Sequence, residues 1–319
     1  MSFSFSPESP FLAFSAAAAG SDKVEKRVLK FPASVCVGSI LLGPMSSDWQ
    51  VHFGEKQVSG AQGVITLNVP KGYQVIFDAN SNVVRNPKIL DNLDVAGVDA
   101  VHIAFIAVDE KEEGKSDEAV AHLGRFTNLV HLNLNRSDAS DRALECLQPL
   151  KSLKAITAYG ANIRGSAFKS LSRFPQLKVV DFSACPVQSI YLKDLAAVPG
   201  LEAVGLGKTR LHSNDLQNLK YLVPLQHLTT LELSSNLIDD NGISYLAPLK
   251  QLKTVALRDT KVSATGLRPL QNRHMVVQLT RISASDRQFL KKEMPGLVVT
   301  TEPLRSVDSE TKKLCAPLK

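Results

Sequence analysis

Apolar side chains recur along this chain in the frame LxxLxL, in which most of the x positions are polar. The frame begins at Leu129, Leu153, Leu177, Leu201, Leu228 and Leu252, so successive starts differ by 24, 24, 24, 27 and 24 residues. A weaker copy begins at Val276, 24 residues after the last, and an upstream copy begins at Val98, 31 residues before the first. A nearly constant period of this length indicates a repeat protein, in which each repeat packs on its neighbours.

Each repeat has two halves with different hydrophobic periods. The LxL part alternates as a half-buried strand does. In the second half, leucines and isoleucines recur every third residue, which suits a short helix or a 3₁₀ turn with one buried edge. Examples are Leu144, Leu147 and Leu150 before Leu153, and Ile243, Leu246 and Leu249 before Leu252. We therefore predict an α/β solenoid with a parallel sheet on its concave face and short helices on its convex face.

The two irregular intervals predict where the solenoid is lengthened. In the 27-residue interval, every third residue from Leu216 to Leu228 is leucine, so three extra residues lengthen the outer turn without changing the apolar phase. The 31-residue interval contains DEKEEGKSDE, from Asp109 to Glu118. We expect this acidic insertion to form a solvated loop.

A third recurring position follows the LxL motif by three residues. It is occupied by Ser137, Ala161, Cys185, Thr209, Asn236 and Thr260. Most of these side chains can form hydrogen bonds with backbone groups that the turn would otherwise leave buried and unpaired. We interpret Cys185 as one of these structural residues rather than as a reactive thiol.

The segments SSNLIDDNGISYLAPLKQLKTVAL and RDTKVSATGLRPL, which together span residues 234 to 270, resemble leucine-rich repeats. They are most similar to the short repeats, common in bacteria, that are written LxLxxTxIxDxGLxxLxxLxxL. The resemblance extends over about residues 98 to 299 and is looser where alanine stands at positions 158 and 161. It implies a horseshoe-like leucine-rich-repeat solenoid used mainly for protein binding, without identifying the bound protein.

The segments outside the repeats have a different pattern. Period-two alternation with intervening turn residues predicts a small antiparallel β unit that covers the open end of the solenoid. The alternating runs are Trp49, Val51 and Phe53, then Ile65, Leu67 and Val69, and, after a turn at Pro70 to Gly72, Tyr73, Val75 and Phe77. We predict a disordered tail at 1–25, this β-rich domain or cap at 26–92, the solenoid at 93–300 and a C-terminal tail at 301–319.

Composition narrows the environment and the partner. The net charge is +6, from 37 basic and 31 acidic residues. The sequence has no long basic run of the kind that would indicate a nucleic-acid partner. No run reaches the ~18 apolar residues of a membrane span. Cys36, Cys146, Cys185 and Cys315 are widely separated, which favours reduced thiols and a cytoplasmic location. The alternative is export, if the apolar stretch from Phe11 to Ala19 acts as a signal peptide, although no Lys or Arg precedes it.

Motifs that would indicate chemistry are incomplete. The segment from Gly205 to Thr209, GLGKT, resembles the end of a phosphate-binding loop, but Glu202 stands where that motif requires its first glycine. His102 and His131 are expected on adjacent strands, yet no further metal ligand can be named. We therefore predict no cofactor, no metal and no catalytic residues.

Alternate strand positions should face the concave side, where a partner would bind. The candidate binding residues are His131, Asn133, Asn135, Tyr159, Asp181, Gly205, Glu232 and Arg258. Tyr159 would anchor the partner, and Asp181, Glu232 and Arg258 would select it by charge. Around Gly205 the side chains are so small that they indicate either a smooth binding trough or merely tight curvature of the neighbouring strands.

These patterns favour a non-enzymatic protein-binding scaffold that uses its concave face. The alternative is a structural subunit of a larger assembly, held through the N-terminal β unit or the basic C-terminus. An enzyme acting through the N-terminal unit is a third hypothesis, which lacks a visible pair of acids or an activated nucleophile.

Overall fold

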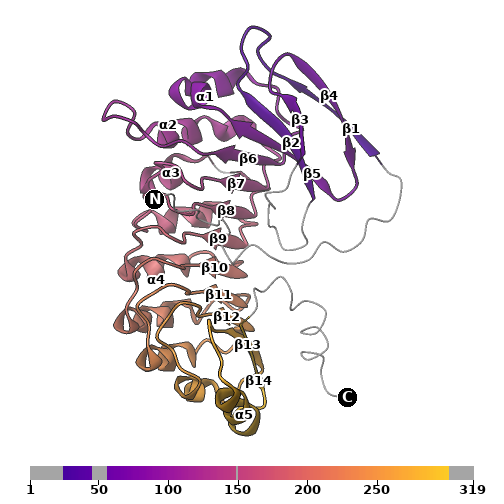
Figure 1. Cartoon of the computed structure of the whole chain (residues 1–319). Helices are drawn as coiled ribbons and strands as arrows, with labels where there is room; N and C mark the ends of the chain where they lie inside the picture. The colour runs from indigo at the N-terminus through magenta and orange to yellow at the C-terminus, as the bar shows by residue number, and fades with distance from the viewer. Residues whose placement is uncertain (1–23, 45–55, 149, 302–319) are drawn as a thin grey trace, which may run out of the picture.

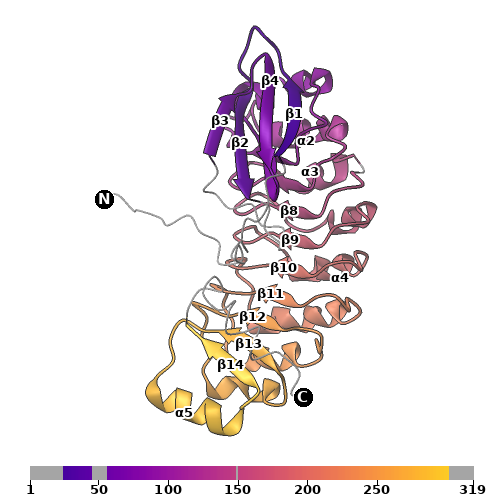
Figure 2. The ribbon, with the colours of Figure 1, turned by 90° about the vertical axis from the view of Figure 1, so that its right-hand side faces the viewer.

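The computed structural model describes residues 24–44, 56–148 and 150–301. Within these residues, one 12-stranded sheet runs the length of the molecule in the order β14 to β5, then β2 and β3. A second sheet pairs β1 with β4. The strands are stacked along one side and the short helices along the other, as Figure 1 and Figure 2 show. The predicted α/β solenoid with an N-terminal antiparallel unit is confirmed.

In its described residues, 24–44 and 56–79, the N-terminal unit contains five strands. These are β1 (Val24–Lys30), β2 (Gly38–Pro44), β3 (Lys56–Gly60), β4 (Val64–Pro70) and β5 (Tyr73–Ala79). Ile65, Leu67 and Val69 are buried and alternate with exposed residues, which confirms the predicted period-two strand. The predicted strand around Trp49, Val51 and Phe53 lies outside the described residues.

The N-terminal unit shares the solenoid's sheet. Strand β5 pairs in parallel with β6 (Ala100–Ile103), with Phe77 opposite Val101. The connection contains α1 (Ser81–Arg85) and the 3₁₀ helix η1 (Pro87–Asn92). The boundary predicted at residue 92 therefore does not interrupt the sheet. Val24, which lies within the predicted tail at 1–25, pairs with Pro70.

The solenoid repeats one strand and one outer turn. Its further strands are β7 (His131–Asn133), β8 (Ala155–Thr157), β9 (Val179–Asp181), β10 (Ala203–Gly205), β11 (Thr230–Glu232), β12 (Thr254–Ala256), β13 (Met275–Gln278) and β14 (Leu297–Thr300). Its outer turns carry α2 (Lys115–Ala121), η2 (Leu123–Arg125), α3 (Asp141–Cys146), η3 (Phe168–Arg173), η4 (Ser189–Tyr191), α4 (Leu192–Leu195), η5 (Ser213–Leu222), η6 (Asp240–Leu246), η7 (Thr265–Leu270) and α5 (Ala284–Glu293). No helix of the described ranges is long and apolar enough to cross a bilayer.

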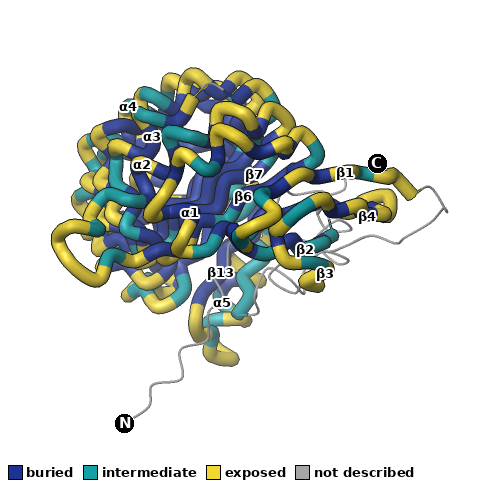
Figure 3. Tube along the Cα trace, turned by 90° about the horizontal axis from the view of Figure 1, so that it is seen from above, coloured by how far each residue is buried: buried dark blue, intermediate teal, exposed yellow. Residues whose placement is uncertain are grey.

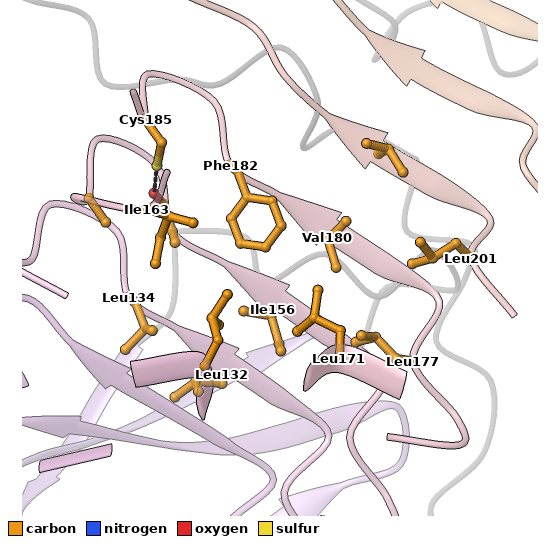
Figure 4. Packing of buried hydrophobic residues seen from close by; sticks show 14 of the residues in the cluster. Leu132, Leu134, Ile156, Ile163, Leu171, Leu177, Val180, Phe182, Cys185 and Leu201 are labelled. Carbon is orange, nitrogen blue, oxygen red and sulfur yellow. Dashed lines mark hydrogen bonds between the residues drawn. The ribbon is translucent and has the colours of Figure 1, made fainter. Parts of the chain in front are cut away.

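The repeated leucine positions form one continuous core. Leu132, Ile156 and Val180 lie on consecutive strands at equivalent positions and are all 0% exposed, and Leu171 packs against them from η3 (Figure 4). Burying each such side chain contributes about 1.5–3 kcal/mol. Seen along the stack, the buried residues lie inside and the exposed residues lie on the outer turns (Figure 3).

The chain takes a left-handed backbone conformation at the same place in most repeats, just after the strand. The residues are Arg136, Gly160, Ala184, Lys208, Ser235 and Asp259, with φ between 52° and 72°. This conformation costs a non-glycine residue roughly 1–2 kcal/mol. The turn is retained because its N–H reaches the next repeat: Ala184 donates to the carbonyl of Gly207 at 2.7 Å, and Arg136 donates to that of Tyr159 at 2.8 Å.

The structural role predicted for the position that follows is confirmed. The hydroxyls of Ser137, Thr209 and Thr260 each donate to a carbonyl three residues earlier at 2.7 Å. The Cys185 thiol donates to the carbonyl of Ala158 at 2.8 Å (Figure 4). Burial raises the pKa of this thiol to about 12, so it stays protonated at neutral pH and is a poor nucleophile.

Both irregular repeats are longer on the outer side. In the 27-residue repeat, η5 has ten residues and buries Leu216, Leu219 and Leu222, as predicted. The 31-residue repeat differs from the prediction, because its acidic segment is only partly a loop. It ends in α2, where Asp117 is 4% exposed. The reason is that the Asp117 carboxylate accepts hydrogen bonds from the N–H and the hydroxyl of Ser140, at 2.8 and 2.6 Å.

Candidate protein-binding face

The concave face is the face of the sheet that points away from the core leucines. Of the eight candidate residues, Asn135, Tyr159 and Arg258 are half-buried. The other five, His131, Asn133, Asp181, Gly205 and Glu232, are buried. The expectation that alternate strand positions expose these five side chains is therefore wrong, and two features of their packing explain part of the difference.

The first feature is that two carboxylates lie against β10. A Cβ added to Gly205 would overlap with the Asp181 carboxylate. A Cβ added to Gly207 would lie 3.3 Å from Oε1 of Glu232. The glycines therefore do not leave an empty trough, because side chains from β9 and β11 occupy the space above them. Asp181 and Glu232 thus fill the space that the smooth-trough interpretation left open.

The second feature is that polar side chains turn back to the backbone of their own strand. Oδ1 of Asn133 accepts the N–H of Asn135 at 2.9 Å. Oδ1 of Asp181 accepts the N–H of Ser183 at 2.9 Å. In the same way, Oε1 of Glu232 accepts the N–H of Ser234 at 2.5 Å. These contacts satisfy backbone donors just beyond the strand ends.

The residues two positions later connect successive repeats. The side chain of Asn135 accepts the N–H of Tyr159 at 2.7 Å, and that of Ser183 accepts the N–H of Gly207 at 3.0 Å. Ser234 accepts the N–H of Arg258 in the same way, at 3.0 Å. Polar acceptors thus occur in every second repeat and hold the next repeat.

Sequence reasoning missed this two-repeat pattern, although its signal is visible. Hydrogen-bond acceptors stand at both positions in Asn133 and Asn135, in Asp181 and Ser183, and in Glu232 and Ser234, with other residue pairs in the repeats between. For three candidates, Asn133, Asp181 and Glu232, the structure therefore supplies a structural role. Whether any of the eight also binds a partner stays a prediction.

Burial shifts the protonation of two groups on this face. Burial raises the pKa of Glu232 to about 7, and the nearby negative charge of Asp181 acts in the same direction. Oε2 of Glu232 has no hydrogen-bond partner among the described residues, and neither has Nε of Arg258. Burial, followed by the nearby His102, lowers the pKa of His131 to about 3, so this imidazole is neutral at pH 7.

The histidines belong to separate polar contacts. Nδ1 of His102 lies 2.9 Å from the Asp78 carboxylate, and Nε2 of His131 lies 3.0 Å from the hydroxyl of Thr157. Within the described ranges, no three His, Cys, Asp or Glu residues are grouped so that they could hold a metal ion. The GLGKT segment is part of the repeat, since Leu206 is 0% exposed and the Thr209 hydroxyl bonds to its carbonyl.

Comparison with known proteins agrees with this architecture. A family model described as Leucine Rich repeat matches residues 225–247, which extend from the end of the η5 turn through β11 and η6. These residues therefore match a leucine-rich repeat. None of the curated proteins compared with this chain matches it.

Solved structures similar to this chain include two internalins from Listeria monocytogenes str. 4b F2365. Internalin C2 is 17% identical, with a TM-score of 0.44, over 69% of this chain and 90% of its own. Internalin F is 16% identical, with a TM-score of 0.40, over 69% of this chain and 61% of its own.

Proposed function

We propose that this leucine-rich-repeat protein is a non-enzymatic scaffold that holds another protein on its concave face. The observation that carries the proposal is a set of partly accessible side chains in one row across three strands. Ala203, Thr230 and Thr254 face one another in register on β10, β11 and β12, and all three are half-buried. Arg258 follows β12 and is half-buried too.

This row suits a protein surface because it combines small contacts with polar anchors. Thr230 and Thr254 present short side chains with hydroxyl groups, and Arg258 carries guanidinium donors for a carbonyl or carboxylate. Tyr159 is half-buried at the end of β8 and adds an aromatic group of the kind that interface hot spots favour. We therefore propose that the partner contacts Thr230, Thr254 and Arg258 rather than the buried carboxylates.

A pair of charge-adding variants tests this proposal. Thr254→Arg should abolish recovery of the partner that co-purifies with the wild-type chain, because a long charged side chain would stand in the row. Ser244→Arg, at an exposed position of η6 on the helical side, is the matched control and should retain the partner. Both variants should melt within a few degrees of wild type. Full binding by Thr254→Arg would place the interface elsewhere.

One observation favours the alternative of a structural subunit. Val28 and Val64 are 45% and 71% exposed near one end of the β1–β4 pair, with Val28 opposite Thr66 and Val64 opposite Lys30. Exposed apolar side chains so close together suit a permanent contact. In that case Val28→Asp with Val64→Asp should release the chain from a complex of fixed stoichiometry, whereas Thr254→Arg should leave it bound.

We also propose that the protein works in the cytoplasm. Cys36, Cys146 and Cys185 are free thiols, which suits a reducing compartment. Fractionation of the native source tests this location, and recovery of the chain outside the cell would contradict it.

A further inference from the structure

The loop between β6 and α2, residues 104–114, exposes two large apolar side chains. Ile106 is 68% exposed, and Val108, at 80%, is the most exposed large hydrophobic residue of the described ranges. The loop stands out from the body of the solenoid just before α2 (Figure 1). Paired positions on the strands from β7 onward are 24 or 27 residues apart up to β12 and 22 apart from β12 to β14, so the copy predicted to begin 24 residues on at Val276 is two residues out of register. The loop belongs to the 31-residue repeat, which is longer than any of these. The added length therefore carries apolar residues outward rather than into the core.

The loop is held in one conformation by Arg85 of α1. Nε of Arg85 lies 2.6 Å from Oε1 of Glu112, and the guanidinium lies over the ring of Phe105, 5.3 Å from its centroid. Oε2 of Glu112 accepts the N–H of Val108 at 3.2 Å. Arg85 thus connects the buried start of the loop with its acidic tip and fixes the backbone that presents Val108.

The tip and the base of the loop have their own hydrogen bonds. The Asp109 carboxylate accepts the N–H groups of Lys111 and Glu112, at 2.9 and 3.2 Å. At the base, the Asp138 carboxylate accepts the N–H of Gly114 at 3.1 Å. The N–H of Asp138 in turn donates to the carbonyl of Phe105 at 2.7 Å. A partner that binds this loop would therefore lose little conformational entropy in ordering it.

The charge around the two apolar side chains is negative. Asp109, Glu110 and Glu113 are exposed beside Ile106 and Val108, with Lys111 as the one exposed cation of the loop. The chain as a whole carries a net charge of +6, so this acidic edge differs from its surroundings. Acidic side chains repel the anionic headgroups of a membrane, and they attract a basic protein surface.

We propose that the β6–α2 loop is a second docking point, separate from the concave face. Its occupant is a segment of a partner protein that carries apolar and basic side chains. Its apolar side chains pack against Ile106 and Val108, and its Lys or Arg side chains pair with Asp109, Glu110 and Glu113. Arg85, Glu112 and Asp138 position the loop without touching the partner.

A phage-displayed library of random dodecapeptides is the probe. It is selected in parallel on the full-length wild-type chain and on the Ile106→Ser/Val108→Ser variant. We expect peptides rich in Lys or Arg and in apolar residues to be enriched on wild type alone. A synthetic copy of such a peptide should bind the double variant at least about tenfold more weakly, as for the loss of an interface hot spot.

Further variants test the contribution of charge and serve as controls. Glu110→Lys/Glu113→Lys should also weaken binding of the peptide. The affinity of the peptide for the wild-type chain should fall as the salt concentration rises. Ile190→Ser removes a side chain that is 57% exposed on η4, and it should bind the peptide as wild type does. Thr254→Arg should likewise leave peptide binding unchanged, because the concave face is not involved.

Three results would overturn the proposal. One is enrichment of the same set of peptides on the wild-type chain and on the Ile106→Ser/Val108→Ser variant. Another is enrichment of peptides without basic residues. The third is self-association of the wild-type chain in sedimentation that disappears in the double variant, because the occupant would then be a second copy of this protein.

Discussion

Asn236 connects two repeats through five hydrogen bonds, and its removal should destabilise the solenoid strongly. Its side chain is buried, at 3% exposure. Nδ2 donates to the carbonyls of Leu206 and Leu233, at 2.8 and 2.9 Å. Oδ1 accepts the N–H groups of Thr209 and Leu211, both at 3.0 Å, and the Thr209 hydroxyl at 3.2 Å. Asn236→Ala removes all five at once.

The size of the loss follows from the groups left behind. The N–H groups of Thr209 and Leu211 would lose this acceptor in a buried turn, and each unsatisfied donor costs about 1–3 kcal/mol. Asn236→Ala should therefore lower the free energy of unfolding by about 2–6 kcal/mol. Asn236→Thr should lose less, because a threonine hydroxyl at this position donates to the strand carbonyl, as Thr260 does to Leu257 at 2.7 Å.

Urea unfolding followed by circular dichroism measures these differences. The midpoint should fall in the order wild type, Asn236→Thr, Asn236→Ala, with an unchanged slope if the same surface unfolds. Asn162→Ala is the control, since Asn162 is exposed and makes one long contact at 3.5 Å. A loss below about 1 kcal/mol for Asn236→Ala would refute the argument that these buried donors depend on Asn236.

Three further predictions test the packing of the concave face and the thiols. Burial raises the pKa of Glu232 in the folded state from 4.5 to about 7, so ionisation of this group lowers the free energy of unfolding as pH rises through that window. In Glu232→Gln the urea midpoint should therefore depend less on pH between about pH 5 and 8, and it should be higher than in wild type at about pH 8. Gly205→Ala should cost about 1–3 kcal/mol by crowding the Asp181 carboxylate, and less in an Asp181→Ala background; additive losses in a double-mutant cycle would contradict that contact. In the native chain, Ellman's reagent should modify exposed Cys36 and leave Cys185 unmodified until urea unfolds the protein, and equal rates would show that Cys185 is accessible.

In the candidate site, the sequence pattern predicted the strand positions of the side chains but not their contacts. The repeat frame placed Asn133, Asp181 and Glu232 on equivalent strands, and their register is as expected. Their contacts were not predictable from periodicity, because each side chain turns toward a backbone N–H two residues ahead. A period identifies the face on which a side chain starts, whereas its rotamer and its neighbours determine where the polar atoms lie.

The acidic insertion is a second example. Its composition correctly indicated exposure for Asp109 and Glu110, but not for Asp117. Asp117 is buried because Ser140, which lies in the following repeat, donates two hydrogen bonds to it. Exposed Ile106 and Val108 could not be distinguished from core residues by their type, because only the folded loop shows that they point away from the core.

The sequence by itself determined the solenoid, its repeat length from β6 to β12 and most residues of its core. A 24-residue period with leucines in a constant frame can bury its apolar side chains only by stacking equivalent strands and turns. It also determined the polar position that holds Ser137, Thr209 and Thr260, because the same local turn recurs in each repeat.

Only the tertiary structure decided how the N-terminal unit joins the repeats and which concave side chains remain accessible. Strand β5 continues the solenoid's sheet through its pairing with β6, a contact between segments of different sequence pattern. The space above Gly205 is filled by Asp181, a residue 24 positions away in the chain. Both features depend on contacts between neighbouring strands, and a periodic sequence specifies which strands are neighbours without specifying how their side chains share the space between them.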